Sequence, residues 1–540
     1  MSPLLIGLHG SLEKSPAKGV HDAAYCLADT DQGQVLALVE SEKISGVRHD
    51  GRLDAALLQA DLASYAGMPA EIVSSHFTTF GDGTLHEFPL FRDLETLDWG
   101  DLGFTTKLTR SLFGTAYPHY VYLHELAHVF SAYMYRTTDH TRFLGLIIEG
   151  SGSFAQNSLF LVDGFRVELL GYNLPILSGN FFHQWLSSLI FDARREDYHI
   201  RSATPGKVMA LAAYGDPERF RPALHAAVRR HRPGQYMDYR KQFCPEIETM
   251  TLSWNDRVDL CASGQALFED LIVDLAVQIR EQYGALPLYY AGGCALSIKT
   301  NTRLRRVFDQ LIVPPNCADD GIALGLVALH AFWEHRTQLQ PLDYHSGLFT
   351  QAHDGLCING RLSDTDVERV ARWLAAGEVV AFVQGAPEIG PRALCRRSIL
   401  ADPAQPGMRD ILNHIKGREY FRPAAPVVLD SVGAQAFKDY FFSPFMLYDF
   451  RVLPNVVEQI PAALHVDGTA RLETVPDDDS DIARLLRAFA QHTGHPPILL
   501  NTSLNSRGKP IAATREQVLA ELPRLKIKHV VFGGQPVVLS

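Results

Sequence analysis

The sequence has no C-x-x-C pair, no low-complexity tract and no fixed-period repeat. Its seven cysteines are few for 540 residues and dispersed, which indicates reduced thiols rather than a disulfide framework. No window approaches the roughly 20 uninterrupted apolar residues of a membrane span. The stretch Met1–Gly7 has no basic n-region, so no signal peptide is expected. We therefore expect a cytoplasmic protein that does not enter membranes.

Positive charge is also scarce, since 61 acidic residues outnumber 50 basic ones and the formal net charge is −11. This balance argues against general binding to nucleic acid or to anionic membranes. Hydrophobic residues make up 46% of the chain and charged residues 21%, an ordinary globular balance. A chain of this length exceeds one hydrophobic core, so two or three domains are expected.

The first part of the chain alternates strand and helix patterns. The expected strands are Leu4–Leu8, Asp22–Leu27, Gln34–Val39, Phe143–Ile148, Leu288–Tyr290 and Leu311–Val313. The expected helices are Asp54–Tyr65, a segment around 124–135, Gln265–Tyr283 and Asp319–Trp333. Alternation of this kind predicts an α/β domain.

The stretch 336–362 has no clear period and contains three glycines, which places a domain boundary near 350. Beyond it the strand and helix plan resumes. The expected elements are helix Ser363–Ala376, strand Val379–Gln384, helix Asp481–Gln491 and strand Ile498–Leu500. Thr514 and Gln517 have the spacing of a capping box for a last helix. The sequence therefore predicts two domains, 1–350 and 351–540.

His124 and His128 stand four residues apart, so a helix would place both on one face, where they could share a metal. With Glu125 between them the run matches the H-E-x-x-H motif of zinc peptidases, in which the glutamate is the general base. Glu149 could be a third ligand. It follows the apolar strand Phe143–Ile148, however, whereas a third ligand in such a peptidase would normally come from another helix. Two bystander histidines on a helix surface remain the alternative.

A basic segment stands out in this acidic chain. Its basic residues between 392 and 422 are Arg392, Arg396, Arg397, Arg409, Lys416, Arg418 and Arg422. Three acids oppose them, and several lie beside glycine or proline, which fixes the backbone. Guanidinium groups on rigid loops suit phosphate and other planar oxyanions. The segment therefore predicts an anion site, with a solvated basic face as the alternative.

About a dozen short strings, in order along nearly the whole chain, carry a family resemblance. They are Gly19–Ala24, Glu40–His49, the His124/His128 pair, Gly206–Gly215, Ala291–Leu296, Pro314–Gly321, Gly390–Leu394, Arg397–Pro403, Lys416–Pro423, His465–Arg471 and Leu500–Asn505. Together they resemble the carbamoyltransferase family of nodulation-factor and antibiotic biosynthesis. Its members join an actin-like domain, related to tRNA threonylcarbamoyl transferases, to a YrdC-like domain.

The resemblance implies an actin-like (ASKHA) domain of two α/β lobes over 1–350 and a YrdC-like α/β domain over 351–540. It also implies an ATP-dependent O-carbamoyltransferase that forms carbamoyl-adenylate from carbamoyl phosphate and ATP in the second domain. The carbamoyl group then passes to a hydroxyl of a small-molecule natural product in the first. The expected cofactors are ATP with Mg²⁺, carbamoyl phosphate and Fe(II), with zinc or manganese as alternative metals.

The resemblance also assigns roles to residues. The catalytic group is His21, as general base, with Asp22 and Arg48, and the metal ligands are His124, His128, Glu149 and Asp319. Carbamoyl phosphate and ATP are assigned to Arg392, Lys416, Arg418, Arg422, Asn501 and Ser503, and a nucleotide in the first domain to Gly292 and Gly293. Four positions depart from the family pattern: Leu123, Glu149, Cys395 and Arg48.

Other functions stay open. A tRNA threonylcarbamoyladenosine-type transferase shares the superfold, but the acidic balance weighs against a tRNA substrate. A zinc metallopeptidase and a non-catalytic nucleotide-binding module are the remaining alternatives. The expected partner is a small-molecule alcohol, with neither nucleic acid nor membrane, and the sequence leaves a homodimer open. The regions 66–118 and 155–260 carry few family strings, so we expect them to shape the acceptor pocket.

Overall fold

The computed structural model describes residues 3–13, 20–80, 105–191, 198–240 and 242–539. The chain forms two compact units. Unit 1 comprises Met1–Leu38 and Gly51–Leu342, and unit 2 comprises Val39–Asp50 and Asp343–Ser540. Each unit combines sheets with helices, which confirms the expected α/β class. The functional roles assigned to 1–350 and 351–540 stay predictions.

The first sheet of unit 1 has the strand order β3-β2-β1-β4-β6-β5. Its centre is β1, whose six residues are all buried, as expected of an apolar run covered on both faces. It pairs antiparallel with β2 and parallel with β4, and β4 pairs parallel with β6. The strands are β1 (Leu4–His9), β2 (Ala24–Asp29), β3 (Gln34–Glu40), β4 (Ala70–Ser75), β5 (Thr105–Leu112) and β6 (Thr115–Tyr122).

The second sheet of unit 1 has the order β9-β8-β7-β10-β11. Its strands are β7 (Arg142–Ile148), β8 (Asn157–Asp163), β9 (Arg166–Tyr172), β10 (Leu288–Ala291) and β11 (Leu311–Ile312). As in the first sheet, the first strand in sequence lies centrally, with an antiparallel neighbour on one side and a parallel one on the other. The two sheets share the order of their first four strands, so unit 1 consists of two related lobes, the arrangement expected of an actin-like domain.

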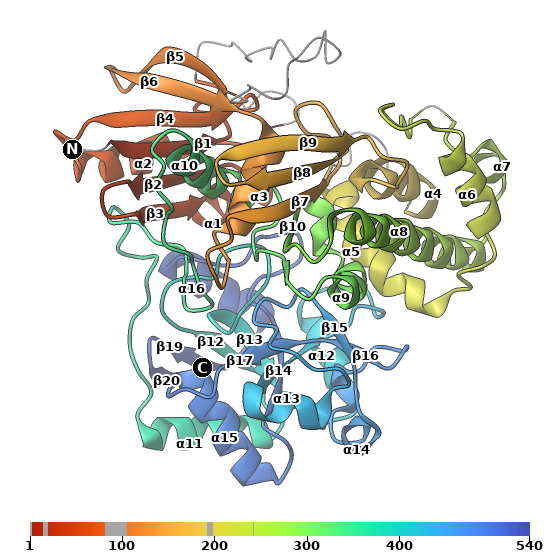
Figure 1. Cartoon of the computed structure of the whole chain (residues 1–540). Helices are drawn as coiled ribbons and strands as arrows, with labels where there is room; N and C mark the ends of the chain where they lie inside the picture. The colour runs from red at the N-terminus through yellow and green to blue at the C-terminus, as the bar shows by residue number, and fades with distance from the viewer. Residues whose placement is uncertain (1–2, 14–19, 81–104, 192–197, 241, 540) are drawn as a thin grey trace. The chain divides into compact units, whose positions relative to one another are not determined.

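Two helices pack against each other between these sheets, α3 (His124–Tyr133) and α10 (Ile322–Trp333) (Figure 1). Helix α10 contacts β1, β2 and β4, while α3 contacts β7 and β10. A methyl group on Gly325 would lie 1.8 Å from the carbonyl oxygen of Ala127, so the helices approach backbone to backbone. Every residue of α3 is buried, which excludes two bystander histidines on a helix surface.

The remaining helices of unit 1 are α2 (Ala55–Ala63), α4 (Ser187–Ile190), α5 (Tyr198–Leu211), α6 (Arg221–Arg229), α7 (Pro245–Glu248), α8 (Trp254–Tyr283) and α9 (Ile298–Val307). The long helix α8 contacts α4, α5, α6 and α9 (Figure 1). Helix α8 begins at Trp254, eleven residues before the expected start, because Ser253 and Asp256 form a capping box there. No helix among the described residues is long and apolar enough to cross a membrane.

Unit 2 is built on a sheet with the order β17-β14-β18-β13-β12-β19-β20, and β15 and β16 form a separate pair. Its strands are β12 (Val380–Val383), β13 (Arg397–Ala401), β14 (Ala425–Leu429), β15 (Asp449–Arg451), β16 (Thr469–Arg471), β17 (Glu473–Val475), β18 (Ile498–Ser503), β19 (His529–Phe532) and β20 (Gln535–Val538). Its helices are α11 (Asp364–Ala375), α12 (Met408–Ile415), α13 (Asp430–Ala436), α14 (Pro454–Val457), α15 (Asp481–Thr493) and α16 (Arg515–Leu525).

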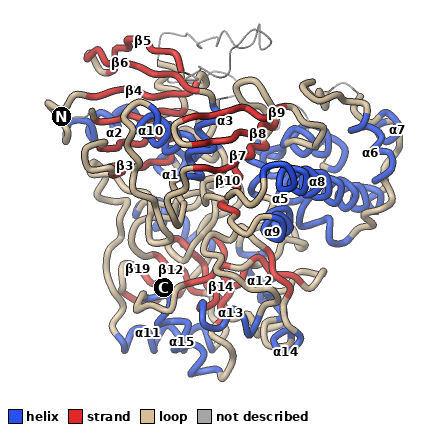
Figure 2. Tube along the Cα trace, in the orientation of Figure 1, coloured by secondary structure: helices blue, strands red, loops and turns tan. Residues whose placement is uncertain are grey.

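The strands of the large sheet bury alternate residues on its two faces. Helices α11 and α15 lie side by side, and their apolar residues share a core with Phe382 and Leu499 (Figure 2). The opposite core joins Val383 and Leu500 to apolar residues of α12 and α16. The capping box expected at Thr514 and Gln517 is confirmed at the start of α16.

The segment Val39–Asp50, with the short helix α1 (Ser41–Ser45), belongs to unit 2 although it lies near the start of the chain. The Lys43 ammonium is fully buried and donates to the carbonyl oxygens of Glu388 (3.1 Å) and Gly390 (2.7 Å). In return, the Gly390 amide donates to Glu40 Oε1 at 2.7 Å. These bonds hold the segment against the loop that carries Arg392.

Candidate metal centre and anion site

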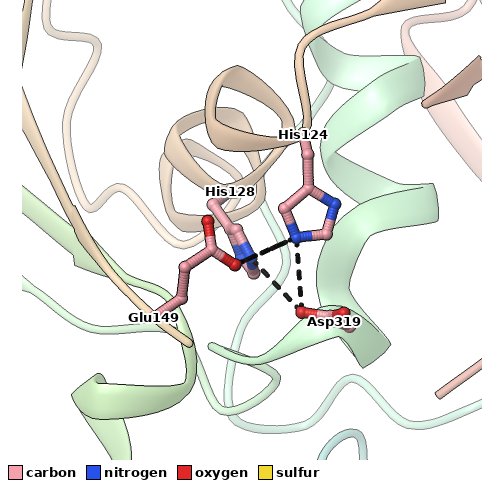
Figure 3. A group of neighbouring side chains, drawn as sticks. All are labelled: His124, His128, Glu149 and Asp319. Carbon is pink, nitrogen blue, oxygen red and sulfur yellow. Dashed lines mark hydrogen bonds and ion pairs between the residues drawn. The ribbon is translucent and has the colours of Figure 1, made fainter. Parts of the chain in front are cut away.

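Four predicted ligands converge in unit 1. His124 and His128 come from α3, Glu149 directly follows β7, and Asp319 opens the short 3₁₀ turn η6 (Asp319–Gly321) before α10 (Figure 3). The Nε2 atom of His124 lies 3.2 Å from Glu149 Oε2 and 3.4 Å from Asp319 Oδ1. The corresponding distances from His128 Nε2 are 3.6 and 3.5 Å. We call these four residues the His–acid cluster.

The charges of the His–acid cluster compensate each other. Burial opposes the charged form of Glu149, but the neighbouring His124 outweighs it and lowers the pKa of that carboxyl to about 2. Burial likewise opposes protonation of His124, yet Glu149 and Asp319 raise its pKa well above the usual range. The two imidazoles and the two carboxylates therefore stabilise each other's charged forms inside unit 1.

The donor atoms also suit a divalent metal. One atom from each residue lies within 4.8 Å of all the others, and three of the residues are buried. Glu149 Oε1 and both Nδ1 atoms are buried and have no hydrogen-bond partner among the described residues. Two imidazoles with two carboxylates form a ligand set that fits Fe(II), zinc or manganese. The residues present can thus hold a metal.

Glu125, the candidate base of a zinc peptidase, makes different contacts. Its Oε1 atom accepts hydrogen bonds from the amides of Phe154 (3.1 Å) and Ala155 (3.3 Å), in the turn that follows Glu149. Burial, and then the charge of Glu149, raise the pKa of its carboxyl. This arrangement gives Glu125 a structural role beside the His–acid cluster.

His21 and Asp22 lie next to the same cluster. His21 Nδ1 is 2.9 Å from Asp22 Oδ2 and 3.7 Å from Asp319 Oδ2. Burial lowers the pKa of His21, but Asp319 and Asp22 outweigh it and raise the value to about 9. About a third of the His21 side chain is exposed, so a substrate can reach it.

Gly292 and Gly293 follow β10 and open a 3₁₀ turn. Gly292 has a φ of 88°, and a methyl group there would lie 2.4 Å from the carbonyl oxygen of Ile148, the residue before Glu149. Gly293 faces open space. Gly292 thus permits the close approach of the two strands that position Glu149, and nucleotide binding by this turn stays a prediction.

Unit 2 gathers four positive side chains, which we call the cationic cluster: Lys416, Arg418, Arg422 and Arg471. Burial, and then Arg418 and Arg422, lower the pKa of Lys416 well below its usual range. Burial and the neighbour Arg422 lower the pKa of Arg418 to about 9. Like charges held together in this way are favourable only when an anion compensates them.

The cationic cluster surrounds the end of β18. Lys416, which is buried, donates to Ser503 Oγ at 3.2 Å and to Asn505 Oδ1 at 2.7 Å. Arg418 donates to Thr502 Oγ1 at 2.9 Å, while its buried Nε has no partner among the described residues. Ser503, whose hydroxyl also donates to Asn505 Oδ1 at 2.6 Å, therefore orients Lys416, and its binding of a ligand stays a prediction.

Arg48 belongs to unit 2, where its charge acts on Arg422 and lowers the pKa of that guanidinium further. Arg392 likewise lowers the pKa of Arg471, although burial contributes more. Arg48 and Arg392 thus lie close enough to the cationic cluster to interact electrostatically with its arginines. Arg48 was assigned with His21 and Asp22 to one catalytic group, but those two residues belong to unit 1.

Asn501 lies in the interior of unit 2. Its Nδ2 atom donates to the carbonyl of Ala393 at 3.1 Å and to Glu473 Oε2 at 2.5 Å. Its Oδ1 atom is buried and has no partner among the described residues. Burial raises the pKa of Glu473 to about 8. The amide oxygen of Asn501 is therefore the atom that remains for a ligand.

Two arginines of the basic segment have structural roles instead. Arg397 is fully buried, and its guanidinium donates to backbone carbonyls that include Ala513 (2.9 Å) and Leu356 (2.7 Å). Arg396 donates to the carbonyls of Ala386 (3.2 Å) and Tyr344 (3.3 Å). The anion site therefore involves fewer arginines than the basic segment contains.

Sequence reasoning missed Arg471, Glu473 and His9 as site residues. Arg471 ends the short strand β16, and Glu473 begins β17. His9 ends β1, is buried, and its Nε2 lies 3.8 Å from Asp319 Oδ2. His9 is a polar residue at the end of an apolar strand, and that position is the signal that could have indicated it. The three-residue strands of Arg471 and Glu473 are not apolar, so they carry no comparable signal.

A two-lobed α/β unit with a buried His–acid cluster and an α/β unit with a cationic cluster define a class of protein with two candidate sites, one whose residues suit a cation and one whose residues suit anions. Family comparison gives the class a name. The carbamoyltransferase N-terminus model matches residues 113–328, and the carbamoyltransferase C-terminus model matches residues 371–538. The chain belongs to the carbamoyltransferase family of enzymes.

Comparison with individual proteins supports the same family assignment. The nodulation protein NolNO of Sinorhizobium fredii is 30% identical, over 98% of this chain and 82% of that protein. The 3'-hydroxymethylcephem-O-carbamoyltransferase of Streptomyces clavuligerus is 30% identical, over 95% of this chain and 96% of that enzyme. Nodulation protein U of S. fredii is 38% identical, but the match spans 46% of each chain.

Among solved structures, a Sua5 variant from P. abyssi is similar to 33% of this chain and covers 52% of its own, at 16% identity and a TM-score of 0.25. Full-length HypF is similar to 61% of this chain and covers 46% of its own, at 14% identity and a TM-score of 0.31. Neither superposes closely on this chain.

Proposed function

We propose that this chain is an ATP-dependent O-carbamoyltransferase that makes carbamoyl-adenylate in unit 2 and transfers the carbamoyl group to an alcohol in unit 1. The observation that carries the proposal is the cationic cluster. Burial, together with Arg418 and Arg422, lowers the pKa of both Lys416 and Arg471, an arrangement that polyanionic substrates would stabilise. Carbamoyl phosphate and ATP are such substrates, and the family supplies the reaction.

In the first step, water releases inorganic phosphate from carbamoyl phosphate and leaves carbamate in the site. A carbamate oxygen then attacks the α-phosphorus of ATP, the bond to the β-phosphate oxygen breaks, and pyrophosphate leaves. The guanidinium groups of Arg418 and Arg422 would neutralise the charge that develops on the phosphate oxygens. The Asn501 amide oxygen would accept a hydrogen bond from the carbamate nitrogen. ATP would enter with Mg²⁺.

In the second step, the acceptor hydroxyl oxygen attacks the carbamoyl carbon, the bond to the AMP oxygen breaks, and the hydroxyl proton passes to His21. A base must be neutral before it accepts a proton, and a pKa of about 9 keeps His21 protonated near pH 7. A divalent cation such as Fe(II), held by His124, His128, Glu149 and Asp319, would share the charge of Asp319 and polarise the carbamoyl oxygen. His21 would then lose its proton more readily.

The acceptor we propose is a hydroxyl of a small-molecule natural product such as an antibiotic precursor. The name of the Streptomyces relative specifies a hydroxymethylcephem. At 30% identity that name supports the reaction class and leaves the acceptor of this chain to experiment. The net charge of −11 supports a small molecule rather than tRNA.

The test supplies the protein with ATP, Mg²⁺, carbamoyl phosphate and a panel of alcohols that includes a 3'-hydroxymethylcephem. We expect pyrophosphate, AMP and a product in which a carbamoyl group replaces the hydroxyl proton, detected by mass spectrometry. Omitting carbamoyl phosphate should stop all three. Pyrophosphate release that depends on threonine, bicarbonate and tRNA instead would contradict the proposal.

A further inference from the structure

A second group of metal-type side chains lies in unit 1, away from the His–acid cluster. Glu71 comes from β4, His330 from the last turn of α10, and His335 from the chain just beyond that helix. The Nε2 atoms of His330 and His335 lie 2.9 and 2.8 Å from the same oxygen, Glu71 Oε2. One ligand atom from each residue lies within 4.8 Å of the other two.

The end of helix α10 is what brings the two histidines together. Residues five apart on a continuous helix point about 140° away from each other, so they could not share one ligand. Here the helix ends at Trp333, so His335 no longer follows the helical spacing. Both Nε2 atoms can therefore lie against the same oxygen of Glu71.

The surroundings of His330 orient it as metal-ligating histidines are oriented. Its Nδ1 atom lies 2.8 Å from the Tyr122 hydroxyl, which leaves Nε2 for a ligand. The Tyr120 ring packs against it with centroids 4.4 Å apart. A hydrogen bond on the far ring nitrogen fixes the tautomer and the direction of the coordinating one.

The charge around the group favours a cation. It lies at the carboxyl end of α10, where the helix dipole is negative, and Glu334 adds a second carboxylate nearby. The facing cation is Lys107 of β5, whose ammonium lies over the Tyr120 ring at 5.1 Å and whose side chain is solvent-exposed. Arg336, next to His335, lies with its guanidinium over the Phe165 ring at 4.5 Å.

The group is also accessible. His330 is fully buried, whereas Glu71 and His335 keep 17% and 22% of their side chains exposed. Glu71 lines a hollow of about 470 Å³ together with Met68, Tyr117 and Pro118. Neither histidine lines this hollow, so the exposed parts of Glu71 and His335 are where an ion would enter the group.

We propose that Glu71, His330 and His335 form a second metal site, which binds Zn²⁺ with a water or an external ligand in the fourth position. Two imidazoles and one carboxylate are a ligand set that zinc uses. The ion would replace the hydrogen bonds between the histidines and Glu71, and it would tie the end of α10 to β4. This site is independent of the proposed carbamoyl transfer.

The experiment measures Zn²⁺ binding by competition with a chromophoric chelator. It uses the full chain carrying His124→Ala and His128→Ala, which removes the imidazoles of the other cluster. We expect one tight Zn²⁺ per chain in this background. Adding His335→Asn should weaken it by about tenfold or more. His225→Asn, a half-exposed histidine on α6, is the matched control and should leave the affinity unchanged.

A second measurement covers the case in which the double variant fails to fold. In the otherwise unaltered chain, His335→Asn should remove one of two bound Zn²⁺ ions and the part of the Zn²⁺-dependent rise in Tm that depends on that ion. Equal zinc content and equal Tm response in the variant and in the unaltered chain would overturn the proposal. So would absence of Zn²⁺ binding in a folded His124→Ala/His128→Ala chain.

Discussion

The His–acid cluster of unit 1 and the cationic cluster of unit 2 handle buried charge in opposite ways. In the first, histidines and carboxylates alternate, so that the pKa of Glu149 falls to about 2 while that of His124 rises. In the second, Lys416 and its neighbouring arginines share one sign, and the pKa of each falls. One cluster is compensated by its own residues, and the other is left with an excess of positive charge.

The difference indicates what each site is built to bind. A cluster with balanced charges and spare lone pairs can exchange its internal hydrogen bonds for a cation. A cluster of like charges is destabilising until an anion enters, so part of the binding energy of a polyphosphate there comes from relieved repulsion. Substitutions in the two clusters should therefore affect different steps of the reaction.

The largest effect is expected from Arg422→Ala in the cationic cluster. Loss of this guanidinium should slow carbamoyl phosphate-dependent pyrophosphate release by roughly 10³-fold, because charge on the transferred phosphate is no longer neutralised. The rate is measured by quenching the reaction at set times and assaying the pyrophosphate released. The matched control is Arg409→Ala, which removes an arginine that pairs with Asp410 at 3.4 Å on the exposed side of α12. A comparable loss in the control would contradict a specific role for Arg422.

His21→Ala should affect the second step of the proposed reaction and leave the first step intact. We expect pyrophosphate release to continue while carbamate ester formation falls by roughly 10²-fold or more, since the proton acceptor of the second step is missing. Both products are followed in the same reaction. Equal loss of the two products would refute this division of labour.

Glu473 gives a pH prediction in unit 2. Its folded pKa of about 8 is above the unfolded value of 4.5, so its contribution to stability is fully present below pH 4.5 and is lost as the pH rises through about 8. Between pH 6 and pH 8 the loss is about 2 kcal/mol at most. Urea unfolding at the two pH values should show it, and Glu473→Gln, which stays neutral, should flatten the dependence. An unchanged slope in the variant would count against a neutral Glu473.

The last prediction concerns stability alone and substitutes Gly325→Ala, next to the His–acid cluster. Alanine usually stabilises a helix relative to glycine, but here its methyl group would clash with the Ala127 carbonyl. Because that carbonyl belongs to a buried helix backbone, we expect a net loss of about 3 kcal/mol in the free energy of unfolding, visible as a lower Tm. A gain in Tm would show that α3 and α10 can separate at no cost.

Local signals predicted many elements of the fold correctly. The helical spacing of apolar residues predicted α11 and α15, and the capping box at Thr514 predicted the start of α16. The early start of α8 was missed although Ser253 and Asp256 form a readable capping box. The placement of Val39–Asp50 in unit 2 could not be read locally, because it depends on the buried Lys43 and on carbonyls about 350 residues away.

The candidate sites were predicted in part. The structure brings the four predicted ligands together, and it places Lys416, Arg418 and Arg422 in one cluster. The basic segment alone could not show that Arg397 serves backbone carbonyls, because those carbonyls come from distant loops. Arg471 and His9 were missed because only the sheet brings their strand ends to the clusters. A region assigned to the acceptor pocket, 66–118, includes 81–104, which lie outside the described residues.

The most direct test of the two-site assignment is the fate of ATP when carbamoyl phosphate is present and no alcohol is added. We predict cleavage to pyrophosphate and enzyme-bound carbamoyl-adenylate, with equal release in the His128→Ala variant, whose defect lies in unit 1. Cleavage of ATP to ADP and phosphate would contradict it, as would pyrophosphate release that does not require carbamoyl phosphate.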